Sequence, residues 1–392
     1  MKKINYICNE INVYLFLFLI VNPIISLITN FFPQFLEIIP NNFIFLLRFI
    51  ILSIPIIKGI NHLNLYSFSF LFILALLLII SSINRDNLII IKHMFMNGEE
   101  ILLILQFIFI SEIKDIKAIF NTFTYLSYII VAILIVLALT GYYGEYAQFR
   151  YMEFSHSIIL YWTFIIQDAY ANKKNNIFYL FYLFIVTLLI ALLSNRAILI
   201  NIFVCLVLFF NLYIHNNQLR KRINYILFCF TTVIVVFFNY IKNLLLHILS
   251  LFNINSYSLI TLELGSFFTS SSRKEIWIRC INSISNHLII GTGIGSDRVI
   301  NANVGLYAHN FLLELWVDFG IIVGSFLCFF YFKNVFSFFK KASTLWRKLF
   351  LPFFINALLI LTFSKSIYIL PEFWMSIAIL CAYFHTNKEV LK

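Results

Sequence analysis

One short stretch of the chain holds the side chains best suited to acid–base chemistry. His309 and Asn310 stand directly before a long apolar run, which Glu314 and Asp318 interrupt. If a helix begins at Asn310, then Asn310, Glu314 and Asp318 recur every four positions and form a polar stripe on one helix face. An imidazole accepts a proton near neutral pH, so His309 is a candidate general base, and a carboxylate of the stripe could hold its ring. The alternative is a histidine that only caps the helix.

A second candidate lies upstream, where Ser272-Arg273-Lys274-Glu275 matches a capping box. A helix should therefore begin at Arg273. Its first amides and the charge of Arg273 would suit a diphosphate group. The alternative is an amphipathic lid helix whose arginine is only solvated. The expected apolar face, turned to the membrane or to the rest of the protein, consists of Trp277, Ile281, Ile284 and Leu288.

Three further arginines are candidate site residues, Arg196 for binding phosphate and Arg48 and Arg150 as supporting residues. Residues 177–210 are too long for one membrane crossing, so the chain must turn at Ser194-Asn195-Arg196. The planar guanidinium of Arg196 then either faces a phosphate or reaches the lipid headgroups. Arg48 lies inside a predicted span and should meet an anion or a carboxylate. Arg150 lies in a tyrosine-rich segment that suits either sugar contacts or anchoring at the membrane surface.

Glycines at positions 291, 293 and 295 precede the histidine. No strand is expected before them, and their spacing differs from a dinucleotide-binding fingerprint. They are therefore expected to allow a turn or a close approach of two backbones. The polar stripe lacks any further spacing typical of metal ligands, so we expect neither a metal nor a cofactor.

The scaffold that must position these residues is a membrane protein. The chain has 392 residues, of which 62% are hydrophobic and 11% charged. Such a composition, with apolar runs along the whole length, predicts an all-α polytopic membrane protein. A crossing helix needs about 20 residues, which gives about twelve spans. The predicted spans are Val13–Phe32, Leu36–Ile57, Leu65–Ile83, Glu99–Ser111, Ala118–Thr140, Ser157–Ala171, Ile177–Leu193, Ala197–Ile214, Ile223–Tyr240, Phe311–Phe332, Leu349–Phe363 and Ile367–Phe384.

The distribution of Lys and Arg sets the expected orientation. Most of them fall between spans on one side, which the positive-inside rule makes cytoplasmic. Both termini are then cytoplasmic. The sequence divides into an N-terminal membrane bundle of about nine spans (1–240), one long outer, periplasmic loop that carries short helices (241–308), and about three C-terminal spans (309–392).

The net charge of +11 does not indicate nucleic-acid binding, because the basic residues form short clusters between apolar runs. The six cysteines do not indicate a disulfide framework either. Only Cys280 falls in the long outer loop.

These motifs together resemble the O-antigen polymerase and O-antigen ligase superfamily of bacterial surface polysaccharide assembly. The resemblance rests on four features in a fixed order along the chain. They are Ser194-Asn195-Arg196 between two spans, Arg273 with Trp277, the turn from Gly291 to Gly295, and His309-Asn310 followed by Gly320 and Gly324.

The resemblance implies a metal-independent glycosyltransferase at the outer face of the cell (inner) membrane. Its donor would be an oligosaccharide linked through diphosphate to undecaprenol, and membrane lipid and a chain-length regulator protein would be its other partners. Arg196 and Arg273 would stabilise the departing diphosphate, and His309 would activate the acceptor hydroxyl. A polymerase would pass the chain to a fresh lipid-linked repeat unit.

Two alternatives stay open at this point. A ligase would use the same donor and pass the glycan to lipid A core, and no residue separates the two acceptors. A flippase for lipid-linked oligosaccharides would also be basic and have many spans. It would not need the outer helix that begins at Arg273, and the two halves of the chain lack the paired repeats that such a transporter would carry.

Overall fold

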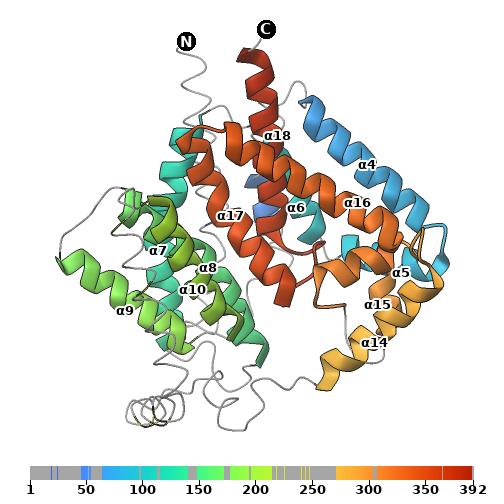
Figure 1. Cartoon of the computed structure of the whole chain (residues 1–392), viewed down its shortest axis with the longest axis horizontal. Helices are drawn as coiled ribbons and strands as arrows, with labels where there is room; N and C mark the ends of the chain where they lie inside the picture. The colour runs from blue at the N-terminus through green and yellow to red at the C-terminus, as the bar shows by residue number, and fades with distance from the viewer. Residues whose placement is uncertain are drawn as a thin grey trace. The chain divides into compact units, whose positions relative to one another are not determined.

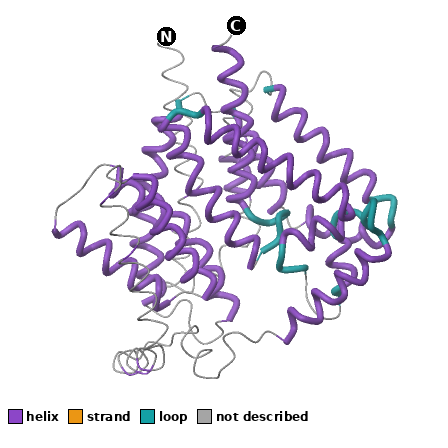
Figure 2. Tube along the Cα trace, viewed as in Figure 1, coloured by secondary structure: helices purple, strands orange, loops and turns teal. Residues whose placement is uncertain are grey.

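The computed structural model describes residues 64–96, 99–112, 115–139, 148–171, 177–193, 196–213, 271–302, 307–363 and 365–390, with residues 46–51 and isolated positions elsewhere. All regular structure in these ranges is helical, which confirms the all-α prediction for them (Figure 2). The helices are α4 (Leu65–Ser81), α5 (Arg85–Met96), α6 (Glu99–Ser111), α7 (Ile116–Leu139), α8 (Gln148–Ala171), α9 (Ile177–Leu193), α10 (Arg196–Tyr213), α14 (Ser271–Asn286), α15 (Ser296–Ile300), α16 (Phe311–Lys341), α17 (Thr344–Phe363) and α18 (Pro371–Val390).

Predicted spans and observed helices agree wherever an apolar run has polar residues at both ends. The predicted ranges Glu99–Ser111 and Ile177–Leu193 coincide with α6 and α9. Other helices are longer than expected, since α8 already begins at Gln148 and α16 continues to Lys341. α5 occupies residues that we expected to form a loop. The predicted spans at 13–32, 36–57 and 223–240 lie largely outside the described residues.

Within the described residues, three helices are long and apolar enough to cross a membrane: Ile116–Leu137, Phe311–Lys341 and Thr344–Thr362. α5 and α6 meet the same standard only as a pair, bent by 68°. These apolar helices support a membrane protein. The total of about twelve crossings, the side on which each loop lies and the three predicted segments stay predictions.

The chain folds into two compact units. The first contains residues 1–22, 34–122 and 271–392, and the second contains residues 23–33 and 123–270. In the first unit α18 is central and packs against α4, α6, α16 and α17 (Figure 1). Trp374 of α18 lies edge-on to Phe70 and Phe107, with ring centroids 5.9 and 6.3 Å away. Its indole also donates a 3.0 Å hydrogen bond to Ile367 O, which anchors the connection between α17 and α18.

The second unit is a helical bundle in which α8, α9 and α10 pack on one another. α9 ends at Leu193 and α10 begins at Arg196, on the two sides of the turn predicted at Ser194-Asn195-Arg196, whose first two residues lie outside the described part. Polar contacts tie this unit together. Trp162 Nε1 donates to Thr187 Oγ1 at 2.9 Å, and Tyr128 donates its hydroxyl proton to the carboxylate of Asp168 at 2.8 Å.

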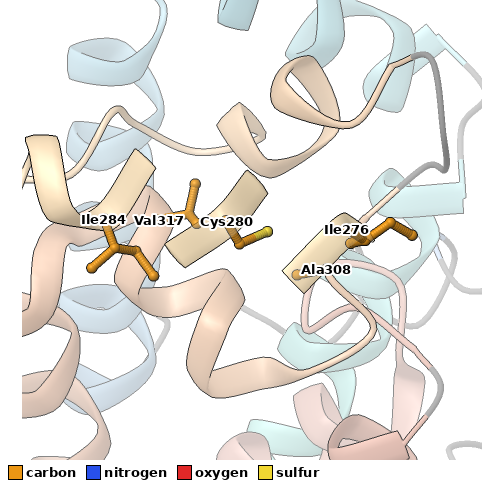
Figure 3. Packing of buried hydrophobic residues seen from close by; sticks show 5 residues of the cluster. All are labelled: Ile276, Cys280, Ile284, Ala308 and Val317. Atoms are coloured by element: carbon orange, nitrogen blue, oxygen red, sulfur yellow. The ribbon is translucent and has the colours of Figure 1, made fainter. Parts of the chain in front are cut away.

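The helix predicted at Arg273 is present as α14, and the side chains that it packs on the rest of the protein are mostly not those of the predicted apolar face. The buried side chains are Ile276, Cys280 and Ile284, which recur every four residues and pack on Ala308 and Val317 (Figure 3). Of the residues expected on one apolar face, Ile284 is buried, whereas Trp277, Ile281 and Leu288 are exposed. α14 is therefore apolar on two sides, and one of them holds the segment before His309 against α16.

Candidate active site

The site is built around a break in α16. Gly320 has φ 76° and ψ 165°, which is not helical and which a residue with a Cβ rarely adopts. The helix therefore consists of a short first part, which carries Glu314 and Asp318, and a long second part. The second part alone has about 20 residues, the length of one crossing. The first part can then lie beyond the crossing.

The glycine-rich segment after α14 closes this break. A Cβ on Gly291 would stand 2.3 Å from Val317 O and 2.5 Å from Gly320 N, so only glycine allows the two backbones to meet. This confirms the predicted close approach, and the positive φ values of Gly293 and Gly295 confirm the predicted turn. Backbone groups that the break leaves without helical partners are paired across the contact. The bonds, each of 2.9 Å, run from Thr292 N to Val317 O, from Gly293 N to Asp318 O and from Ile321 N to Leu288 O.

α4 and α5 hold the same segment from the other side. Asn87 donates to Thr292 O at 2.6 Å and accepts from Ser296 Oγ at 3.2 Å. Ser81 Oγ accepts from Ile294 N at 2.8 Å. The residues between 84 and 97, to which the sequence assigned no role, therefore fix the position of the glycine turn.

Arg298, which the sequence analysis did not select, is the centre of a buried polar network. Its Nη1 lies 3.3 Å from Asp297 Oδ1 and 3.7 Å from Glu314 Oε1, and its Nη2 donates to Ser366 Oγ at 3.0 Å. Its guanidinium also lies 5.9 Å from the ring centroid of Tyr307. The side chain of Arg298 is only 12% exposed. It joins α15, the first part of α16 and the connection between α17 and α18.

Glu314 and Asp318 confirm the predicted stripe in one respect, because both side chains are buried on the first part of α16. Glu314 accepts hydrogen bonds from Ser366 Oγ and, at 3.0 Å, from Ile367 N. Asp318 accepts from the hydroxyl of Tyr368 at 2.6 Å. Among the described residues Asp318 Oδ1 has no hydrogen-bond partner. The connection between α17 and α18 thus supplies the partners of both carboxylates.

Acidic side chains outnumber basic ones in this network. Asp297, Glu314 and Asp318 all act on the buried guanidinium of Arg298. Burial raises the pKa of Asp297, while Arg298, the amide of Ala308 and the imidazole of His309 oppose that rise. Burial acts to lower the pKa of Arg298, but the carboxylates outweigh it and the pKa is raised. Arg298 therefore stays charged.

His309 lies at the edge of this network and is half-buried. Its ring stands 4.2 Å from the ring of Tyr307, centroid to centroid. Its φ is 53°, which makes it the one non-glycine residue with positive φ in the described part of the chain. The cap of α16 is Asn310, whose Oδ1 accepts from the amides of Leu312 and Leu313. The alternative that His309 merely caps the helix therefore has no support in the geometry.

Arg273 belongs to the same region as His309. It lies in the first turn of α14 and is partly exposed. Burial raises the pKa of the Tyr307 phenol, Glu314 adds to the rise, and the charges of Arg298 and Arg273 oppose it. The charge of Arg273 therefore acts on the tyrosine whose ring packs against His309.

The remaining predicted residues lie elsewhere. Arg196 is the first residue of α10 and Arg150 lies in the first turn of α8, both in the second unit, and their side chains are outside the described part. Arg48 is half-buried in the helical residues 46–51 of the first unit. Within the described ranges, no group of three His, Cys, Asp or Glu side chains is arranged to hold a metal ion.

Comparison with known proteins addresses the segment that contains these residues. Searches of curated proteins and of solved structures gave no significant match. Residues 181–328 match the family described as O-antigen ligase. This segment includes Arg196, α14, the glycine turn, Arg298 and His309. This match confirms the resemblance inferred from the motifs, and it is consistent with the O-antigen polymerase and ligase superfamily.

Proposed function

We propose that this protein is a polysaccharide polymerase, which joins undecaprenyl-diphosphate-linked repeat units at the outer face of the cytoplasmic membrane. The observation that carries the proposal is the packing of the half-buried His309 on Tyr307, whose phenol also feels the charge of Arg273, within the segment that matches the O-antigen ligase family. A histidine and an arginine in one region suit the two tasks of glycosyl transfer from a lipid diphosphate, which are activating the acceptor and stabilising the leaving group.

The reaction balances with these groups alone. The oxygen of the acceptor hydroxyl attacks the anomeric carbon of the donor, and its proton passes to the imidazole of His309. The bond between the anomeric carbon and the phosphate oxygen breaks, and undecaprenyl diphosphate leaves with the bonding electrons. Arg273 and Arg196 offer planar guanidinium groups to the leaving phosphates. The charge that a metal ion would otherwise neutralise is met by these two side chains.

The same proposal includes the location of the enzyme, its orientation and its partners. The enzyme lies in the cell (inner) membrane with both termini in the cytoplasm, takes its donor from the lipid bilayer and works with a chain-length regulator protein. The ligase alternative is favoured by one observation, the description of the matching family. A ligase would use the same residues on the donor and differ only in its acceptor, lipid A core.

A deletion strain separates the two. Loss of a polymerase leaves single repeat units attached to core, because ligation continues without chain extension. Loss of a ligase leaves long chains on undecaprenol and none on core. Gel analysis of the surface polysaccharide, with the wild-type gene restored on a plasmid as control, reads out the difference. Long core-linked chains in the deletion strain would rule out both functions.

A further inference from the structure

Two neighbouring residues of α15 hold the segment that ends in His309. Asp297 Oδ2 accepts a 2.9 Å hydrogen bond from Ala308 N, so its carboxylate lies against the residue immediately before the histidine. The guanidinium of Arg298 lies 5.9 Å from the ring centroid of Tyr307, whose ring meets the imidazole at 4.2 Å. One residue fixes the backbone before His309, and the other fixes the ring that contacts it.

These two residues are themselves rigidly placed. The side chain of Asp297 is fully buried, and its backbone carbonyl accepts a 2.8 Å hydrogen bond from Asn301 Nδ2. Arg298 is bound to Glu314 and Ser366 on two other segments. Such support is needed, because a left-handed conformation at His309 is unfavourable for a residue with a Cβ. Strained conformations of this kind persist where the surroundings determine them.

We propose that Asp297 and Arg298 are positioning residues for His309. Both set the location of its imidazole, and the carboxylate of Asp297 favours the imidazolium that forms as the acceptor is deprotonated. The inference rests on the proposed function of His309 as general base. Charged and titratable groups described in this region include Asp297 and Arg298 of α15, Glu314 of α16, Arg273 of α14 and Tyr307.

The sign of the electrostatic effect is fixed by Asp297. The charge of the imidazole opposes the rise in the pKa of Asp297, so the two groups interact electrostatically. A negative group near an imidazole stabilises the protonated ring. Replacement by asparagine keeps the shape and an oxygen for the Ala308 amide but removes the charge, so the neutral ring becomes more populated at low pH. In a Ser-His-Asp triad, too, a buried aspartate orients the catalytic histidine and stabilises its protonated form.

The first experiment needs no substrate. The purified full-length protein is treated with diethyl pyrocarbonate, which modifies neutral imidazole, and the peptide that contains His309 is quantified by mass spectrometry. For Asp297→Asn we expect the rate of modification at about pH 5.5, relative to that at about pH 8, to rise up to about tenfold. A simple loosening of the fold would raise both rates and leave their ratio unchanged. An unchanged ratio for Asp297→Asn overturns the electrostatic half of the inference.

The second experiment measures turnover with undecaprenyl-diphosphate-linked repeat units extracted from the deletion strain. Asp297→Asn and Arg298→Lys are expected to lower kcat about 100-fold, since misplacing a catalytic group by about 1 Å costs that much, with KM unchanged. The acidic limb of the pH profile should move to lower pH in Asp297→Asn. Lysine keeps the charge at 298 but lacks the planar fork that binds several partners at once.

Matched controls come from the exposed ion pair between Glu275 and Arg279 on α14. Glu275→Gln and Arg279→Lys repeat the same chemical changes outside the network and should behave as wild type. If folded Asp297→Asn and Arg298→Lys variants turn over at the rate of these controls, the positioning role is wrong, while the proposed function stands. If wild type extends no chains, the proposed function fails, and the modification ratio still decides whether Asp297 supports the charge on His309.

Discussion

A methyl group at Gly291 should separate the glycine segment from the break in α16. The added Cβ would lie 2.3 Å from Val317 O, 2.4 Å from Asp318 C and 2.5 Å from Gly320 N. All three are backbone atoms, which cannot rotate away as a side chain can. The segment must therefore move, and the three backbone hydrogen bonds across the contact are weakened or lost. At about 0.5–1.5 kcal/mol each, their loss destabilises this region by about 2–4 kcal/mol.

Gly295 provides the matched comparison. It also has positive φ, but the atom nearest to an added Cβ is Ile90 Cγ2 at 3.0 Å, the end of a flexible side chain. Gly295→Ala should therefore cost only about 1–2 kcal/mol, the penalty of the left-handed conformation. Thermal unfolding in detergent, followed by tryptophan fluorescence, measures both variants. Trp277 and Trp316 report on this region, since their indoles donate to Ala308 O and Ser325 Oγ.

The expected order of apparent melting temperature is wild type, then Gly295→Ala, then Gly291→Ala. Because the three bonds hold the part of α16 that carries Glu314 and Asp318, chain extension should fall with Gly291→Ala as well. A Gly291→Ala variant as stable as Gly295→Ala would refute the claim that the two backbones meet at this glycine.

Two further predictions concern the arginines and the topology. Lysine at 196 or 273 should already shorten the polymer in cells that contain normal amounts of the protein, because a point charge does not replace bidentate phosphate binding. Full-length polymer from both Arg196→Ala and Arg273→Ala would leave these arginines as lipid-facing residues only. Reporter fusions at Lys174 and Lys341 should report the cytoplasm and a fusion at Ser256 the outer face, and a cytoplasmic signal at Ser256 would contradict the mechanism.

The helices were predictable where local composition defines them. α6 and α9 are apolar runs with polar residues at both ends, so the change in composition marks their limits. α5 was missed because its sequence mixes Arg85, Asp86 and Lys92 with apolar residues, a pattern also typical of loops. The break at Gly320 was missed for a different reason. A glycine in an apolar run is compatible with a straight helix, and only the distant backbone of residues 288–293 makes the break stable.

The candidate site shows the same limit. His309 and Arg273 could be selected because each stands at a helix start next to a recognisable motif. Arg298 was not selected as a site residue, although it directly follows Asp297 and the glycine turn. Its partner Ser366 is 68 residues away in the sequence. The best sequence signal for Arg298 was the pair Glu314 and Asp318 in an apolar helix. Acidic side chains in such a helix pair with a basic side chain from another segment.

The central claim is that this chain extends lipid-linked glycans with His309 as base, and reconstitution tests it most directly. The purified protein in liposomes is given undecaprenyl-diphosphate-linked repeat units from the deletion strain, with EDTA present, and the products are separated on a gel. Wild type and the Glu275→Gln control should give a ladder of lengthening chains, and His309→Asn, which cannot accept the proton, should give none. A ladder from well-incorporated His309→Asn, or none from wild type, would contradict the account.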